Sequence, residues 1–85
     1  MKLIYIHALG CMTCMIMNDR ILSLQEKTNL PLTQYNIDFD DIPFQNIGHY
    51  FPVTIIMNDG IELERIVGEW DLETMIQKVR RYQND

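Results

Sequence analysis

The chain has 85 residues, of which 47% are hydrophobic and 22% charged, and its formal net charge is −5. This length and composition fit one small domain, residues 1–85, with a packed core, and they exclude long disordered tracts. The negative charge argues against nucleic acid and membrane surfaces as main partners, since both are themselves anionic.

The N-terminal segment contains the first expected strand. Residues 2–7 form a continuous apolar run, which is typical of a central strand covered on both faces. The run is much shorter than the ~18 apolar residues of a membrane span. Residues 1–9 resemble a very short export-signal core, but the apolar stretch is too short for one and includes Tyr5 and His7, so we discount an export signal. We therefore expect a cytoplasmic protein, in which a single cysteine pair is more often catalytic or metal-binding than structural.

The only two cysteines, Cys11 and Cys14, form a Cys-Met-Thr-Cys motif shortly after this strand. Apolar residues at intervals of three and four then predict an amphipathic helix over residues 14–27. A thiol between a strand and a helix lies close to backbone N–H groups that stabilise a thiolate. A second thiol one turn later can resolve a mixed disulfide. The placement of the pair therefore predicts dithiol–disulfide chemistry.

The middle of the chain contains one more clear element and one ambiguous segment. Alternating apolar and polar residues predict a second strand over residues 33–39. Residues 40–50 include Pro43 and Gly48 and fit either a short helix or an irregular turn.

The C-terminal part predicts a hairpin followed by a helix. Strands are expected at residues 53–57 and 61–67, joined by the tight-turn sequence Asn58-Asp59-Gly60. Asp71 fits the N-cap of a helix whose apolar stripe extends over residues 72–82.

This order of elements, with Cys-x-x-Cys after the first strand, resembles the thioredoxin fold, and in particular the glutaredoxins and glutaredoxin-sized thioredoxins. Pro52, just before the third strand, is similar to the family's cis-proline, and Val67-Gly68 is similar to the Val-Gly that closes the thioredoxin sheet. The resemblance covers nearly the whole chain. It implies an α/β fold of order βαβ-αββα, a four-stranded mixed sheet flanked by helices on both faces.

The resemblance also implies a function and a site. It implies a thiol–disulfide oxidoreductase or electron carrier in which Cys11 attacks the substrate disulfide and Cys14 resolves the mixed disulfide. The third strand would run antiparallel beside the first, and this brings Pro52 next to Cys11. A protein disulfide and an upstream reductase are the implied partners, and the dithiol itself carries the electrons without an organic cofactor or a metal. The implied substrate-binding residues are Met12, Thr13, Phe51, Pro52, Gly68 and Trp70.

Several positions depart from the family patterns. Tyr5 stands where thioredoxin keeps a buried acidic residue, and Gln34 stands in place of its lysine partner. Proton transfer to and from Cys14 must then use water or another group. In the stretch where glutaredoxins bind glutathione, only Gly68 and Asp71 match, and this makes glutathione doubtful as a substrate.

A rival function is a non-catalytic module that holds a metal or a partner chain. Residues 12–14, Met-Thr-Cys, resemble the opening of copper-chaperone loops, and thiolate and thioether ligands suit Cu(I). That motif has its second cysteine at the position of Met17, and those domains end on a strand, whereas this chain is predicted to end on a helix. The dithiol reaction therefore remains the leading hypothesis.

Some other side chains have two interpretations each. His7 either assists the thiols in proton transfer or is an ordinary strand-end residue, and His49 either lines the same face or is a plain loop residue. The ordinary interpretation is favoured for both histidines. Trp70 either forms an apolar rim with Tyr50 and Phe51 or packs the start of the last helix, and these two are evenly balanced.

Overall fold

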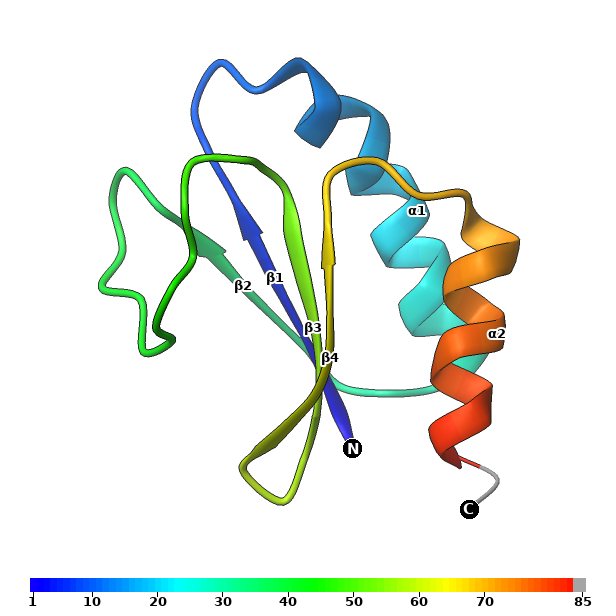
Figure 1. Ribbon diagram of the computed structural model, residues 1–85. Helices are drawn as coiled ribbons and strands as arrows, with labels where there is room; N and C mark the ends of the chain where they lie inside the picture. The colour runs from blue at the N-terminus through cyan, green and yellow to red at the C-terminus, as the bar shows by residue number, and fades with distance from the viewer. Residues whose placement is uncertain (84–85) are drawn as a thin grey trace.

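In the computed structural model, which describes residues 1–83, four strands and two helices follow one another (Figure 1). The strands pair in the order β2-β1-β3-β4, with β1 parallel to β2 and antiparallel to β3, and with β4 antiparallel to β3. The fold is therefore the mixed four-stranded sheet flanked by helices that the sequence predicts. The elements are β1 Lys2–His7, α1 Met12–Thr28, β2 Leu32–Asn36, β3 Val53–Asn58, β4 Ile61–Val67 and α2 Leu72–Gln83.

These strand directions give the sheet two distinct edges. β1, β2 and β4 end at one edge, where β3 and both helices begin, and we call this the carboxyl edge (top of Figure 1). The opposite edge, which we call the hairpin edge, holds the turn between β3 and β4 and the start of β1, and both helices run toward it (Figure 1). The cysteine pair lies at the carboxyl edge, because it joins the end of β1 to the start of α1.

Both helices cover the same face of the sheet. One buried cluster joins this face to the apolar stripes of α1 and α2, and it contains Leu3, Tyr5, Met17, Ile21, Leu24, Ile56, Ile66, Met75, Ile76 and Val79. The expectation of helices on both faces is therefore wrong. The other face, with Ile4, Ile6, Val53, Ile55 and Met57 at its core, is covered by apolar side chains of the segment between β2 and β3.

That segment, residues 37–52, forms an irregular loop and not a short helix. Pro43 lacks the N–H that a helix interior needs and disfavours helical backbone at the residue before it. The backbone is left-handed at Asn46 (φ 59°) and at Gly48 (φ 75°), so no regular turn continues through it. Its apolar side chains pack on the sheet and bury this face, so no helix is needed to cover it.

Two element boundaries differ from the sequence prediction for local reasons. β2 ends at Asn36 instead of residue 39, because the Asp40 carboxylate accepts a hydrogen bond from the Asn36 N–H at 2.7 Å and turns the chain. α1 begins at Met12, two residues before the predicted start. The β3–β4 turn is as predicted, with positive φ at Asp59 (51°) and Gly60 (78°), the type I′ geometry favoured in two-residue hairpins.

Neither of the two helices described is long and apolar enough to cross a bilayer.

Candidate active site

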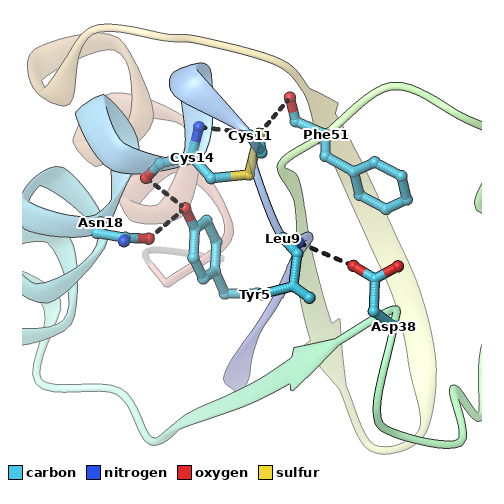
Figure 2. Close-up of a disulfide and its surroundings, with 7 residues drawn as sticks. All are labelled: Tyr5, Leu9, Cys11, Cys14, Asn18, Asp38 and Phe51. Carbon is cyan, nitrogen blue, oxygen red and sulfur yellow. Dashed lines mark hydrogen bonds between the residues drawn. A yellow bond between two sulfur atoms is a disulfide. The ribbon is translucent and has the colours of Figure 1, made fainter.

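Cys11 and Cys14 are joined by a disulfide at the start of α1 (Figure 2). Their Cα atoms are 5.2 Å apart. Cys14 is buried, with 3% of its surface exposed, and it belongs to the buried face of α1. Cys11 is half-buried, so it is the more exposed residue of the two.

The Cys11 side chain caps the helix. Its backbone is extended (φ −89°, ψ 105°), and its Sγ accepts a hydrogen bond from the Cys14 N–H at 3.1 Å. Oxygen side chains usually occupy this position, and here a sulfur takes their place. The first turn of α1 contains no acidic residue, so the partial positive charge of the helix N-terminus has no carboxylate to compensate it. Both effects favour a negative charge on Cys11 Sγ after reduction.

The loop that leads into the motif is held from another part of the chain. The Leu9 N–H donates a hydrogen bond of 2.8 Å to the Asp38 carboxylate, which follows β2 (Figure 2). Gly10, immediately before Cys11, has a φ of 67°, which side-chain-bearing residues rarely adopt. The Leu9–Asp38 bond links residues 29 positions apart, and no sequence pattern pointed to it.

Tyr5 lies beneath the start of α1 (Figure 2). It is fully buried, and its Oη lies 2.8 Å from Asn18 Oδ1 and 3.3 Å from the Cys14 carbonyl oxygen. The hydroxyl has one proton, so it donates to one of these oxygens at a time. Burial raises the pKa of Tyr5 to about 12, and the phenol is therefore neutral at physiological pH. A neutral group tied to α1 thus stands where thioredoxin has a buried acid, and Gln34, its Cα partner on β2, is exposed.

The segment before β3 meets the cysteines from the other side. The Phe51–Pro52 peptide bond is cis, and the Phe51 carbonyl oxygen lies 3.7 Å from Cys11 Sγ (Figure 2). A disulfide sulfur has no proton, so this is a contact here, whereas a Cys11 thiol could donate to the carbonyl. The Gly68 N–H donates a 2.8 Å hydrogen bond to the Pro52 carbonyl. The Phe51 carbonyl therefore lies beside Cys11, and the backbone of Gly68 is bonded to the next residue, Pro52.

The remaining predicted site residues are Met12, Thr13 and Trp70, and they lie near the starts of the two helices. Met12 and Thr13 follow Cys11 in the first turn of α1, and Met12 is 75% exposed. Trp70 donates from Nε1 to the Val67 carbonyl at 3.3 Å, and the Lys78 Nζ lies 5.1 Å from the centre of its ring. The indole packs against the cluster under the helices, as expected of a residue that supports the start of α2.

The two histidines occupy different surroundings. His7 stacks on Tyr5, with ring centroids 5.7 Å apart, at the end of β1. His49 is exposed in the loop before β3. Within residues 1–83, no three His, Cys, Asp or Glu side chains gather in a way that could hold a metal ion.

Known structures provide a comparison for this geometry. No protein-family model and no curated protein sequence matches the chain significantly. Among solved structures, thioredoxin 1 from Thermosipho africanus is similar with a TM-score of 0.83 at 21% identity, covering 99% of this chain and 96% of that one. The periplasmic thioredoxin SoxS from Paracoccus pantotrophus has a TM-score of 0.72 at 17% identity, with coverage of 99% and 98%. Thioredoxin from Fasciola hepatica has a TM-score of 0.70 at 18% identity, with coverage of 94% and 80%.

These similarities in backbone agree with the strand order of the mixed sheet and with both helices beginning at its carboxyl edge. The protein has a thioredoxin-like fold with a Cys-x-x-Cys pair joined in a disulfide.

Proposed function

We propose that this protein is a cytoplasmic, glutaredoxin-sized thiol–disulfide oxidoreductase, a single domain over residues 1–85 that carries electrons to protein disulfides. The main support is the Cys11–Cys14 disulfide, in which the sulfur of the more exposed cysteine, Cys11, also caps a helix. An upstream reductase would return the oxidised pair to the dithiol.

The reaction proceeds in two exchange steps. The Cys11 thiolate attacks one sulfur of the substrate disulfide, so that a mixed disulfide forms and the other substrate sulfur leaves as a thiolate and takes up a proton. Cys14 then loses its proton and attacks Cys11 Sγ. This second step forms the Cys11–Cys14 disulfide and releases the second substrate thiol. Two electrons pass to the substrate, and the protein dithiol is oxidised.

The surroundings of Cys11 suit these steps. The Cys14 N–H and the helix N-terminus stabilise the attacking thiolate. Met12, Thr13 and Gly68 offer surface on which a substrate segment can lie, and the Phe51 backbone offers it a hydrogen-bonding edge beside Cys11. Trp70, just before α2, would add apolar surface for the substrate segment. Cys14 is buried, so it cannot reach the substrate disulfide directly and attacks only the mixed disulfide on Cys11.

The experiment that tests this proposal is a redox titration of the Cys11–Cys14 pair in dithiothreitol or glutathione buffers, with free thiols counted at each potential. We expect one reversible two-electron transition that is lost in Cys11→Ser. Its midpoint would distinguish a reductant from an oxidant, since thioredoxin-fold proteins range from about −270 mV to about −120 mV. Failure to form an intramolecular disulfide at any potential would contradict the proposal and favour metal or partner binding without turnover.

A further inference from the structure

The net negative charge of this protein is concentrated at one edge of the sheet. The carboxyl edge carries six exposed carboxylates from the segments after β2 and β4 and the first turn of α2, and its only guanidinium is that of Arg20. These groups sum to −5, which equals the formal charge of the whole chain. Arg20 is already engaged by Glu69 at 3.3 Å and by the Trp70 carbonyl at 2.9 Å. The six acidic residues are Asp38, Asp40, Asp41, Glu69, Asp71 and Glu73.

The cations lie elsewhere. Lys2 begins β1, Lys27 ends α1, and Arg80 and Arg81 lie in the last turn of α2, all at the hairpin edge. The two other basic side chains are paired within the described chain, Arg65 with Glu62 at 2.7 Å and Lys78 with Glu64 at 2.8 Å. The negative charge of the carboxyl edge is therefore not neutralised by the basic side chains of the described chain.

Exposed apolar side chains gather at the same edge. They lie on the loop before α1, on its first turn, on the loop between β2 and β3 and at the end of β4. Large exposed apolar side chains grouped in this way mark contact surfaces more often than scattered ones do. These side chains, with their exposed fractions, are Leu9 (63%), Met12 (75%), Met15 (70%), Phe39 (73%), Tyr50 (79%) and Val67 (46%).

We propose that the carboxyl edge docks protein substrates whose reactive disulfide is flanked by lysine or arginine residues next to an apolar side chain. The inference rests on the proposed function and specifies its substrate class. Opposite charge speeds the encounter and orients the partner, while apolar contact at Cys11 supplies contact area. A second copy of this chain does not fit, because two edges of charge −5 repel each other, and anionic lipid or nucleic acid is repelled for the same reason.

The range of this effect depends on salt. The screening length is ~8 Å at physiological ionic strength and ~30 Å at 0.01 M. The molecule extends 35 Å and 25 Å along its two longer axes, so at physiological salt the cations of the hairpin edge do little to offset the carboxyl edge. The electrostatic preference should therefore be strongest at low salt.

The test uses three synthetic peptides with one intramolecular disulfide and the same apolar neighbour, flanked by lysine, serine or glutamate. The reduced protein is mixed with each peptide at 10 mM and 150 mM ionic strength, and the second-order rate constant of protein oxidation is measured. Each event converts the dithiol to the Cys11–Cys14 disulfide and the peptide disulfide to two thiols. We expect the lysine peptide to react about tenfold or more faster than the glutamate peptide at 10 mM, with a smaller ratio at 150 mM.

Two variants with the same change of net charge localise the effect. Asp41→Lys places a cation at the carboxyl edge, and Glu26→Lys places one in the last turn of α1 at the hairpin edge. Both side chains are exposed, so both variants should fold, and thermal unfolding verifies this. The lysine-over-glutamate ratio should fall about threefold in Asp41→Lys and stay close to the wild-type value in Glu26→Lys.

The outcomes separate this inference from the proposed function. Equal rates for all three peptides, or faster reaction of the glutamate peptide, would overturn the substrate class while leaving the oxidoreductase intact. Equal effects of the two variants would also overturn it, because the preference would then follow total charge and not the carboxyl edge. No reaction with any peptide would overturn both the substrate class and the oxidoreductase function. The redox titration checks the second of these independently, because it measures the dithiol without a peptide.

Discussion

At the hairpin edge, β3 passes into β4 through two residues, whereas at the carboxyl edge β1 passes into α1 through a longer loop, residues 8–11, that carries Cys11. Both connections use a glycine with positive φ, Gly60 at 78° and Gly10 at 67°. A methyl group on either glycine would meet no atom within 4 Å. The two edges therefore impose the same backbone requirement.

The chemistry, in contrast, is found at one edge only. The hairpin turn joins the two antiparallel strands β3 and β4. The carboxyl edge combines a disulfide, a capped helix N-terminus, exposed apolar side chains and unneutralised carboxylates. The buried sheet between them supplies stability to both, which frees the loops of the carboxyl edge for contacts with a partner. Substitutions at the two edges should thus separate stability from reactivity.

The largest expected effect comes from the two cysteines. Cys14→Ser should abolish turnover but leave Cys11 able to form a lasting mixed disulfide with a peptide, because no second thiol remains to displace it. Cys11→Ser should abolish turnover without forming that adduct, since Cys14 is buried. Mass spectrometry of the products detects the adduct. Turnover by Cys14→Ser at the wild-type rate would indicate a one-cysteine mechanism instead.

The two glycines give the sharpest comparison of the edges. Gly10→Ala and Gly60→Ala should each destabilise the protein by about 1–2 kcal/mol, since left-handed backbone is costly for residues with a Cβ. For a domain of this size each kcal/mol lowers the Tm by roughly 4–8 °C. Gly10→Ala should also slow reduction of a peptide disulfide, because it disturbs the residue before Cys11, whereas Gly60→Ala should not. Equal losses of rate in both variants would contradict a separation of the edges.

Tyr5→Phe should have a moderate effect on stability. It removes a hydroxyl that ties β1 to α1 and keeps the packed ring, so the loss should be about 0.5–1.5 kcal/mol in the free energy of unfolding. Urea titration measures it. Because the Cys14 carbonyl loses a donor, the redox midpoint of the pair should also move, and an unchanged midpoint would show that Tyr5 serves packing alone.

The same variant tests the pKa of Tyr5. An unfolded tyrosine ionises near pH 10, and the folded one has a pKa of about 12, so its contribution to stability is complete below pH 10. As the pH rises from 10 to 12, ionisation favours the unfolded chain, and this contribution is lost. The stability difference between wild type and Tyr5→Phe should therefore shrink over that range. A constant difference in urea titrations up to pH 12 would argue against a raised pKa.

The smallest effects are expected from exposed apolar side chains, one at each edge. Met12 is 75% exposed and Ile61 is 65% exposed, so truncating either to alanine should change stability by no more than about 0.5 kcal/mol. Met12→Ala should slow reduction of a peptide disulfide with an apolar neighbour by about 2–5-fold, from the contact area lost to the substrate. Ile61→Ala provides the matched control and should react at the wild-type rate. Parallel rate losses would mean that the apolar contact is not localised at the carboxyl edge.

Local sequence signals were enough to place most elements of this fold. The apolar run of β1, the Asp59-Gly60 turn, the Asp71 cap and the apolar stripe of α2 each depend on residues within a few positions of one another. The position of the cysteine pair between a strand and a helix was predictable for the same reason.

The remaining features depend on residues far apart in the chain. That both helices share one face, with residues 37–52 sealing the other, follows from how the apolar surfaces pack together. The bond from the Leu9 N–H to the Asp38 carboxylate joins residues 29 positions apart. The end of β2 is an exception, because it depends on a local bond from the Asn36 N–H to the Asp40 carboxylate that the alternating pattern of the strand does not reveal.

The sequence by itself determined the strand and helix order and the presence of a dithiol at the end of β1, because periodicity, caps and turn residues act locally. Only the tertiary structure decided what surrounds the dithiol. It placed Tyr5 under the helix start and the Phe51 carbonyl beside Cys11. Those contacts join positions 9 and 40 residues apart, and they form only when burial of the common core brings the segments together.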